Sequence, residues 1–317
     1  MGLAAAAEHH SKRDDLRVLY GLATDSDVFA FRTHLRSSLE DEVSQARVPT
    51  AIMSGEHCSS RLVTTEEIEV LKEILGGVFD DITIVLYLRR QDEFLASTYS
   101  TDVKSGSAAR FELPGEEQIR ERYDYQVLVE RWVRSFGTGR IICRRYGKGF
   151  LKCENIIDDF FDAIKVLEPE RLTNLKRPPR VNESLGAEAC EFLRLFNTCI
   201  PRLTRDGINP LRGKIERLLS EVSPGPGIGL TDETAEIFMA RFREGNAYIA
   251  AQFFGGQFEP PGDPLFGPAE GGRRVTAQPD ISTEQAMKIF GMLWEKKQQE
   301  VIDGELKIRQ LKERLKK

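Results

Sequence analysis

The feature that most constrains the fold is a continuous apolar run, ITIVLYL at residues 82–88, which ends at Arg89 and Arg90. Because its apolar side chains occupy both alternating faces, the run predicts a strand that is covered on both sides, as in a parallel sheet flanked by helices. In such sheets, ligands bind beyond the carboxyl ends of the strands. The sequence therefore predicts that the two guanidinium groups face an anion.

The segments around this run alternate between strand-like and helix-like patterns. Apolar runs at 48–53 (VPTAIM) and 140–143 (RIIC) predict two further strands. Between the first two strands, residues 64–77 predict a helix that starts with Thr64 and Glu67 at capping-box spacing and ends at two glycines. This order predicts an α/β fold in which helices flank a parallel β-sheet.

The later part of the chain has a mainly helical pattern. We expect one α/β domain over residues 1–255, with a helical part that starts at about residue 182. Residues 256–281 are rich in Pro and Gly and are predicted to form a linker. Residues 282–317 are predicted to form a C-terminal helix.

Apolar residues recur every seven positions along this C-terminal helix, and others occupy the companion position of the heptad. The first set is Met287, Trp294, Val301, Ile308 and Leu315, and the second is Phe290 and Leu311. This spacing is typical of a short coiled coil, although Lys297 and Gly304 interrupt it. Two interpretations stay open, namely self-association and a charged surface helix packed on the domain.

The composition argues against several classes of protein. A net charge of -5 at pH 7 argues against a chain that coats nucleic acid. The five cysteines form no CxxC pair and no zinc-type spacing, so we expect no disulfide framework, no metal, and a reducing, cytoplasmic location. No run of about 18 apolar residues occurs, so no membrane span is predicted.

The residues after the arginines extend the predicted anion site. If a helix starts directly after Arg90, Ser97 and Ser100 lie on one face of it. A guanidinium fork beside a hydroxyl is well suited to a phosphate monoester, because the fork is always charged and makes paired hydrogen bonds. The alternative is that Arg89 or Arg90 forms a salt bridge with a neighbouring carboxylate such as Asp92.

The segment LRRQDEFLAS, with Ser97 eight positions after Arg89, resembles the 3'-phosphate-binding segment of sulfotransferases that use 3'-phosphoadenosine-5'-phosphosulfate, their bacterial branch in particular. Further similar stretches are IMSGEH, YDYQVLVERWVRSFG followed by RIICRRY, IIDDFF, and NESLGAEACEFLRLFN. The resemblance implies a P-loop NTPase-like sulfotransferase fold and a donor whose 3'-phosphate is held by Arg89 and Ser97. Arg90 and Ser100 are further cofactor-binding candidates because of their positions at the strand end and on the helix face.

The same resemblance implies a catalytic base. In this family, the loop before the 3'-phosphate strand supplies a glutamate or a histidine that takes the proton from the acceptor hydroxyl. Glu56 and His57 stand at this place in IMSGEH, and we expect Glu56 to be the base, with His57 as the second candidate. The alternative is an exposed polar loop without a chemical role.

One part of the family pattern is missing. The family begins with a strand and a loop of the Lys-x-Gly-Thr-Thr kind, which cradles the 5'-phosphosulfate. This sequence runs directly into a helical pattern at 27–43 without such a loop, and FGTGR at 136–140 lies between a helix and a strand, which is the wrong context. We therefore expect an N-terminally truncated form of the fold that keeps the 3'-phosphate half of the donor site.

Two functions follow as alternatives. The first is transfer of a sulfuryl group from 3'-phosphoadenosine-5'-phosphosulfate to a hydroxyl or amine of a small-molecule, saccharide or lipid acceptor, with adenosine 3',5'-bisphosphate as the product. The second is a non-catalytic nucleotide- or partner-binding relative that assembles as a homo-oligomer through the C-terminal helix. A P-loop phosphotransferase is disfavoured because GxxxxGK[ST] does not occur.

Asn246 matches a family asparagine, and Arg273 and Arg274 form a basic pair in the predicted linker.

Overall fold

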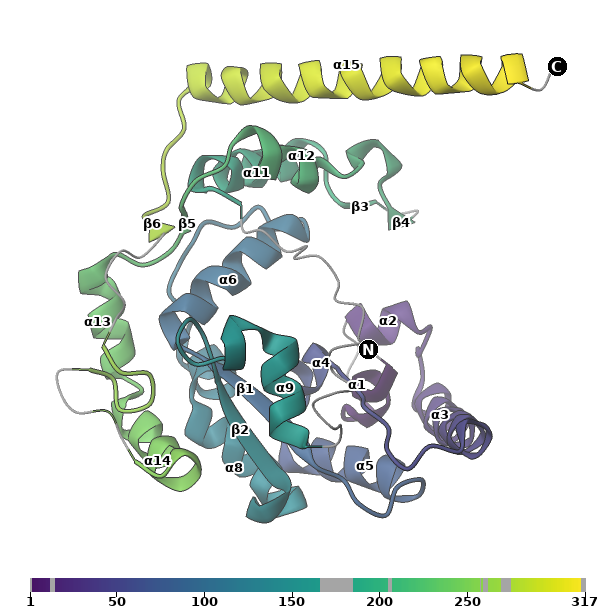
Figure 1. Ribbon diagram of the computed structural model, residues 1–317, viewed down its shortest axis with the longest axis vertical. Helices are drawn as coiled ribbons and strands as arrows, with labels where there is room; N and C mark the ends of the chain where they lie inside the picture. The colour runs from purple at the N-terminus through teal and green to yellow at the C-terminus, as the bar shows by residue number, and fades with distance from the viewer. Residues whose placement is uncertain are drawn as a thin grey trace. The chain divides into compact units, whose positions relative to one another are not determined.

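The structure is a computed structural model that describes residues 2–11, 15–165, 185–204, 207–256, 258, 262–268 and 275–314. The chain divides into two compact units, which are described separately. The first unit comprises Met1–Arg90, Pro114–Lys176 and Ala240–Ala269, and the second comprises Gln91–Leu113, Arg177–Met239 and Glu270–Lys317. Figure 1 labels most of their helices and strands.

The first unit is built around a parallel pair of strands, β1 (Ile84–Arg89) and β2 (Ile141–Tyr146) (Figure 1). The register places Leu86 opposite Cys143 and Arg89 opposite Tyr146. The helix α8 (Tyr125–Phe136) packs on both strands, and α9 (Ile156–Ile164) packs on β2. The strands predicted at 82–88 and 140–143 are thereby confirmed, with bounds shifted by a few residues.

The helix α5 (Thr65–Gly76) begins where its capping box predicts. The Thr64 hydroxyl accepts a hydrogen bond from the Glu67 amide at 3.2 Å, and the Glu67 carboxylate accepts one from the Thr64 amide at 3.2 Å. These two bonds satisfy amides at the helix start that have no partner within the helix. The buried side chains Ile68 and Leu71 then place α5 in the same core as β1 and α8.

Further helices complete the first unit. They are α1 (Gly2–Ala7), α2 (Asp15–Leu19), α3 (Asp25–Ala46), α4 (Glu56–Arg61), α7 (Glu116–Gln118), the π-helix η1 (Ile119–Tyr123), the 3-10 turns η2 (Thr138–Arg140) and η3 (Lys152–Glu154), and α14 (Arg243–Phe254). Alanines 4 to 7 of α1 are buried, and this helix packs against α3 and α5. Small side chains allow this close helix packing without loss of apolar burial.

The predicted strand at 48–53 is wrong, because this segment forms no helix or strand in the structure. Val48 and Ile52 are 51% and 53% exposed, so their apolar side chains do not join the core. Apolar composition favours a strand only where a neighbouring strand accepts its backbone hydrogen bonds. In the described part of the first unit, the parallel sheet consists of β1 and β2.

Residues 262–268 lie within the range that was expected to be a linker, yet they form a compact turn of the first unit. The Asp263 carboxylate accepts hydrogen bonds from the amides of Leu265 and Phe266 at 2.9 and 3.0 Å. Leu265 is fully buried and joins the core of β1 and α8. Gly267 has a φ of 73°, which glycine adopts without strain, so it closes the turn. Arg273 and Arg274 lie outside the described residues.

The second unit is helical with two small strand pairs. Its elements are α6 (Gln91–Lys104), α11 (Ala187–Cys199), α12 (Ile215–Val222), α13 (Asp232–Ala240), α15 (Thr283–Arg314), the 3-10 turn η4 (Pro210–Arg212), the antiparallel pair β3 (Leu203–Thr204) and β4 (Gly207–Ile208), and the parallel pair β5 (Gly227–Ile228) and β6 (Val275–Thr276). Buried side chains of α6, α11, α12 and α15 form its core, among them Val103, Leu193, Leu219 and Leu293.

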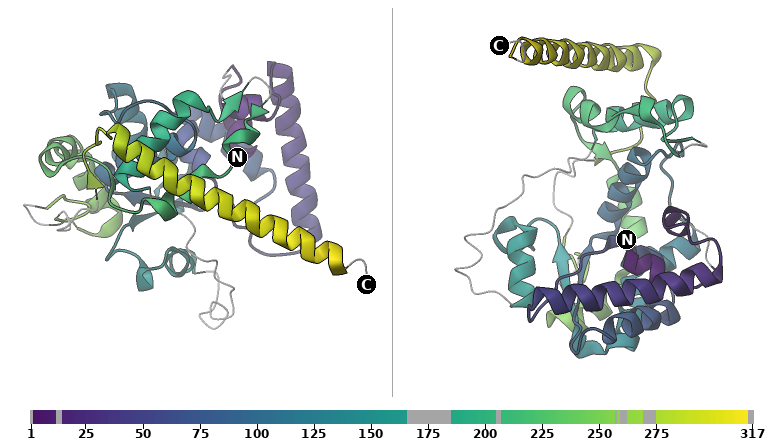
Figure 2. Two further views of the ribbon diagram at one scale, coloured as in Figure 1. Left: turned by 90° about the horizontal axis from the view of Figure 1, so that it is seen from above. Right: turned by 90° about the vertical axis from the view of Figure 1, so that its right-hand side faces the viewer.

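The predicted C-terminal helix is confirmed as α15, a single helix of 32 residues (Figure 2). Ile289 and Leu293 are 3% and 7% exposed and join the core of the second unit. Trp294 and Ile308, which belong to the heptad pattern, are 58% and 54% exposed. The described heptad residues therefore lie on a different face from the one that packs, and Leu315 lies outside the described residues. Among the described residues, no helix is both long and apolar enough to cross a membrane.

Candidate functional site

Arg89 is the last residue of β1, as the apolar run predicts. Its backbone carbonyl accepts a hydrogen bond from the Tyr125 hydroxyl at the start of α8. Its guanidinium carbon lies 5.6 Å from the centre of the Tyr146 ring, which follows from the register of the two strands. A ring face at this distance attracts and orients a guanidinium group. The sheet therefore places a half-buried, oriented cation at the carboxyl end of β1.

Two neighbouring arginines hold the 262–268 turn against the sheet. Arg90 donates to the Gly267 carbonyl at 3.4 Å, and Arg145 of β2 donates to the Leu265 carbonyl at 3.2 Å. The guanidinium of Arg145 lies within 4.7 to 5.1 Å of the ring centres of Phe150, Phe254 and Phe258. Burial and the nearby charge of Arg144 lower the pKa of Arg145. Arg90 thus has a structural contact beside its predicted ligand role.

The fourth strand-end arginine, Arg144, is bound to a buried carboxylate. Asp159 of α9 accepts hydrogen bonds from Arg144 at 2.9 and 2.6 Å, and from the Tyr87 hydroxyl at 2.7 Å. Burial alone would raise the pKa of Asp159, but the bonds from Arg144 and Tyr87 outweigh it and lower the pKa. Asp159 belongs to the IIDDFF stretch, and through this network it attaches α9 to both strands of the sheet.

The predicted serines lie on α6 in the second unit. Ser97 is half-buried, and its backbone carbonyl accepts a hydrogen bond from the Thr101 hydroxyl at 3.0 Å. The Ser100 hydroxyl oxygen is buried and has no hydrogen-bond partner among the described residues. The helix that the sequence predicts after the arginines is confirmed by the bounds of α6. Arg89 belongs to the first unit and Ser97 to the second. That both side chains bind the same phosphate therefore stays a prediction.

Glu56 and His57 are the first two residues of α4. The Glu56 side chain is 90% exposed, and its carboxylate lies 3.8 Å from Nε2 of His57. The segment before them is not a strand, so these residues do not stand at a strand end as expected. An exposed carboxylate beside an imidazole is able to accept a proton from a bound hydroxyl, and their catalytic roles stay predictions.

Asn246, which matches a family asparagine, is almost fully buried on α14. Its side-chain amide donates to the Asp263 carboxylate at 3.0 Å. Asn246 therefore holds the 262–268 turn.

Among the described residues, no group of three or more His, Cys, Asp or Glu side chains is placed to hold a metal ion.

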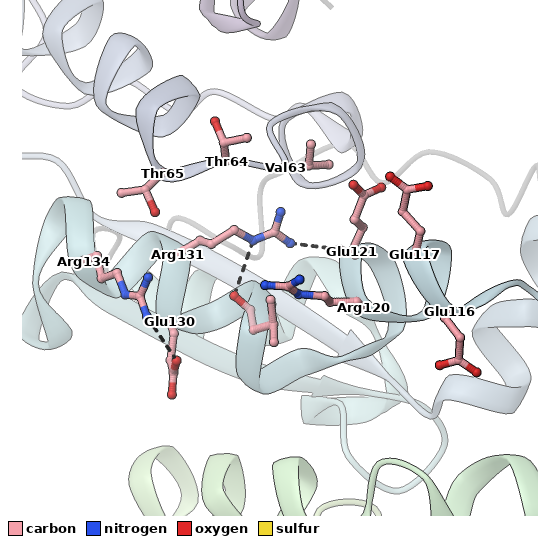
Figure 3. Close-up of a pocket in the computed structure, with 11 residues that line it drawn as sticks. Val63, Thr64, Thr65, Glu116, Glu117, Arg120, Glu121, Glu130, Arg131 and Arg134 are labelled. Atoms are coloured by element: carbon pink, nitrogen blue, oxygen red, sulfur yellow. Dashed lines mark hydrogen bonds and ion pairs between the residues drawn. The ribbon is translucent and has the colours of Figure 1, made fainter.

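A cavity of about 680 Å³ in the first unit was not predicted from the sequence (Figure 3). It is lined by Val63, Thr64, Thr65, Glu116, Glu117, Arg120, Glu121, Val127, Glu130, Arg131 and Arg134. Its most buried charge is Arg131, which is 6% exposed. One signal was present in the sequence, because Arg131 lies three residues after Leu128 and next to Trp132, on the apolar side of its helix.

Comparisons with known proteins give no functional description. No protein-family model matches the sequence, and no solved structure matches it significantly. Over 176 residues, the chain is 30% identical to an uncharacterized protein of Archaeoglobus fulgidus. This match covers 54% of the chain and 46% of the archaeal protein, so the chain spans less than half the length of that relative.

Proposed function

We propose that the chain binds a nucleotide that carries a 3'-phosphate, and that Arg89 is the principal contact to that phosphate. The observation that carries the proposal is the order of elements: β1 ends at Arg89, and α6 begins at Gln91 and carries Ser97 and Ser100. This is the strand, arginine, helix and serine order of the 3'-phosphate-binding segment in sulfotransferases that use 3'-phosphoadenosine-5'-phosphosulfate.

The chemistry of the side chains fits a phosphate monoester. A guanidinium group offers paired charge-assisted hydrogen bonds, and the Tyr146 ring limits the orientations that Arg89 adopts. In this proposal Ser97 donates to the 3'-phosphate, while Arg90 chiefly holds the 262–268 turn.

The reaction that we propose is transfer of a sulfuryl group to a hydroxyl or amine of a saccharide, lipid or small-molecule acceptor. Adenosine 3',5'-bisphosphate is then the product that stays bound through its 3'-phosphate. Glu56 is the proposed base, and His57, whose Nε2 lies 3.8 Å from the Glu56 carboxylate, is the second candidate. If Glu56 is the base, Glu56→Gln will abolish whatever sulfuryl transfer the wild-type chain catalyses and leave binding of adenosine 3',5'-bisphosphate unchanged.

A calorimetric titration tests the binding proposal. The purified chain is titrated with adenosine 3',5'-bisphosphate and, separately, with 5'-AMP, which lacks the 3'-phosphate. We expect tighter binding of the bisphosphate and its loss in Arg89→Ala. The matched control is Arg140→Ala, because Arg140 directly precedes β2 at the amino-terminal end of the parallel strands, opposite to the end that carries Arg89, and is half-exposed in a salt bridge with Asp81.

The second candidate function, a non-catalytic relative that assembles through its C-terminal helix, is favoured by one observation. The heptad residues Met287, Trp294 and Leu311 on α15 are 60%, 58% and 57% exposed. Apolar side chains at heptad spacing are the seam by which coiled coils associate. This candidate predicts an oligomer in solution and no sulfuryl transfer by any form of the chain.

A further inference from the structure

The cavity of the first unit contains a buried arginine and several charged side chains that form no ion pair among the described residues. Arg131 of α8 donates to two backbone carbonyls, those of Glu121 at 2.8 Å and Val127 at 3.3 Å. No carboxylate among the described residues comes within ion-pair distance of it. Burial is the main cause that lowers the pKa of Arg131; the charges of Glu121 and Glu67, which lie beyond ion-pair distance, act in the opposite direction, and that of Arg120 lowers it further. A buried guanidinium bound only to neutral acceptors attracts an anion.

The other charges of the cavity divide into two groups. Glu116 and Glu130 are held by arginines, since Arg241 bonds to both carboxylate oxygens of Glu116 at 2.6 Å and Arg134 lies 3.7 Å from Glu130. In the described part of the chain, no ion pair holds Arg120, Glu117 or Glu121. Figure 3 shows the Arg120 and Arg131 side chains in the middle of the cavity and those of Glu117 and Glu121 toward one end.

This arrangement selects for a ligand with both signs of charge. A simple anion would be attracted by Arg131 and Arg120 but repelled by the carboxylates of Glu117 and Glu121, and a simple cation would meet the reverse. A molecule with a negative group at one end and a positive group at the other would be attracted both by the arginines and by the carboxylates. The volume of about 680 Å³ is within the range of small-molecule sites.

We infer that this cavity binds a small zwitterion that carries an oxyanion, either carboxylate or phosphate, and an ammonium group. The oxyanion contacts the guanidinium of Arg131, with Arg120 beside it. The ammonium group contacts the carboxylates of Glu117 and Glu121. The inference uses residues distinct from Arg89, Ser97 and Ser100, so it stands or falls independently of the proposed nucleotide site.

The test is a set of calorimetric titrations of the full chain. The zwitterions are phosphoethanolamine and γ-aminobutyrate, and the separate halves are inorganic phosphate, acetate and ethylammonium. We expect at least one zwitterion to bind about tenfold or more tightly than either of its halves, because two charge-assisted contacts act on one molecule. The tighter of the two zwitterions identifies the preferred oxyanion.

Two variants separate ligand binding from a structural role of Arg131. Glu121→Gln removes a cavity charge but keeps the backbone carbonyl that accepts from Arg131, and we expect it to weaken zwitterion binding about tenfold without weakening phosphate. Arg131→Gln should weaken both, with folding checked by circular dichroism. The control is Arg36→Gln, in an exposed ion pair of α3 outside the cavity. Zwitterions that bind no better than their halves, or that bind Glu121→Gln and wild type equally, would overturn the inference.

Discussion

At the residue scale, Asp159 shows how one buried carboxylate connects a helix to the short sheet. Its partners Arg144 and Tyr87 come from adjacent strands, so its removal leaves the Tyr87 hydroxyl without this acceptor and leaves Arg144 with the longer ion pair to Asp162 at 3.6 Å. We expect Asp159→Ala to lower the free energy of unfolding by about 2 to 4 kcal/mol, measured by urea denaturation. The control is Asp162→Ala, whose carboxylate is 39% exposed, and which should cost less. Equal effects of the two variants would contradict this account.

The pH dependence of stability follows from the same carboxylate. The folded-state pKa of Asp159 is lowered, so its contribution to stability is present above its unfolded pKa of about 3.9 and is lost as pH falls through the folded value. Wild type should therefore lose more stability on acidification below about pH 4 than Asp159→Asn does. Urea denaturation at a series of pH values measures this difference. Parallel curves for the two proteins would show that Asp159 does not contribute.

At the element scale, the 262–268 turn behaves as part of the core of the first unit. Leu265 is fully buried, and the turn is held by Arg90, Arg145 and Asn246 through the contacts described above. We expect Leu265→Ala to lower the free energy of unfolding by about 2 to 4 kcal/mol, because truncation of a buried leucine removes apolar contacts and leaves a cavity. Chemical denaturation is the measurement. A change below about 0.5 kcal/mol, typical of surface positions, would mean that the turn is a linker.

The two faces of α15 allow a matched pair of substitutions. Leu293 is buried in the second unit, whereas its neighbour Trp294 is 58% exposed on the heptad face. If the heptad face mediates self-association, Trp294→Ala will shift the sedimentation profile toward the monomer without loss of stability. Leu293→Ala should instead destabilise the fold, by about 2 to 4 kcal/mol. A monomeric wild-type chain at high concentration would contradict self-association.

At the scale of the whole molecule, local signals predicted the elements well. The capping box of Thr64 and Glu67 located α5, and the apolar run up to Arg89 located β1, because both depend on residues close in sequence. The strand at 48–53 failed because a strand requires a partner that its own sequence does not specify. The 262–268 turn was missed because the Pro and Gly content of this segment is typical of a linker. The sequence alone did not show that Asp263 accepts backbone hydrogen bonds there or that Leu265 is buried.

The candidate site was predictable only in part for the same reason. The sequence identified Arg89 as a strand-end cation and placed Ser97 and Ser100 on one helix. It gave no sign that Arg90 and Arg145 hold a distant turn, because those contacts join residues more than 100 positions apart in the chain. The cavity around Arg131 likewise depends on tertiary packing between the start of α5 and α8 with its preceding turns.

The central claim is that Arg89 holds a 3'-phosphate, and one calorimetric comparison tests it most directly. Adenosine 3',5'-bisphosphate and 5'-AMP are titrated into wild type, Arg89→Ala and Arg140→Ala under the same conditions. The account predicts that the bisphosphate binds more tightly than 5'-AMP to wild type and to Arg140→Ala, and that this preference disappears in Arg89→Ala. Equal affinity of the two nucleotides for folded wild type, or a preference that survives in Arg89→Ala, would contradict it.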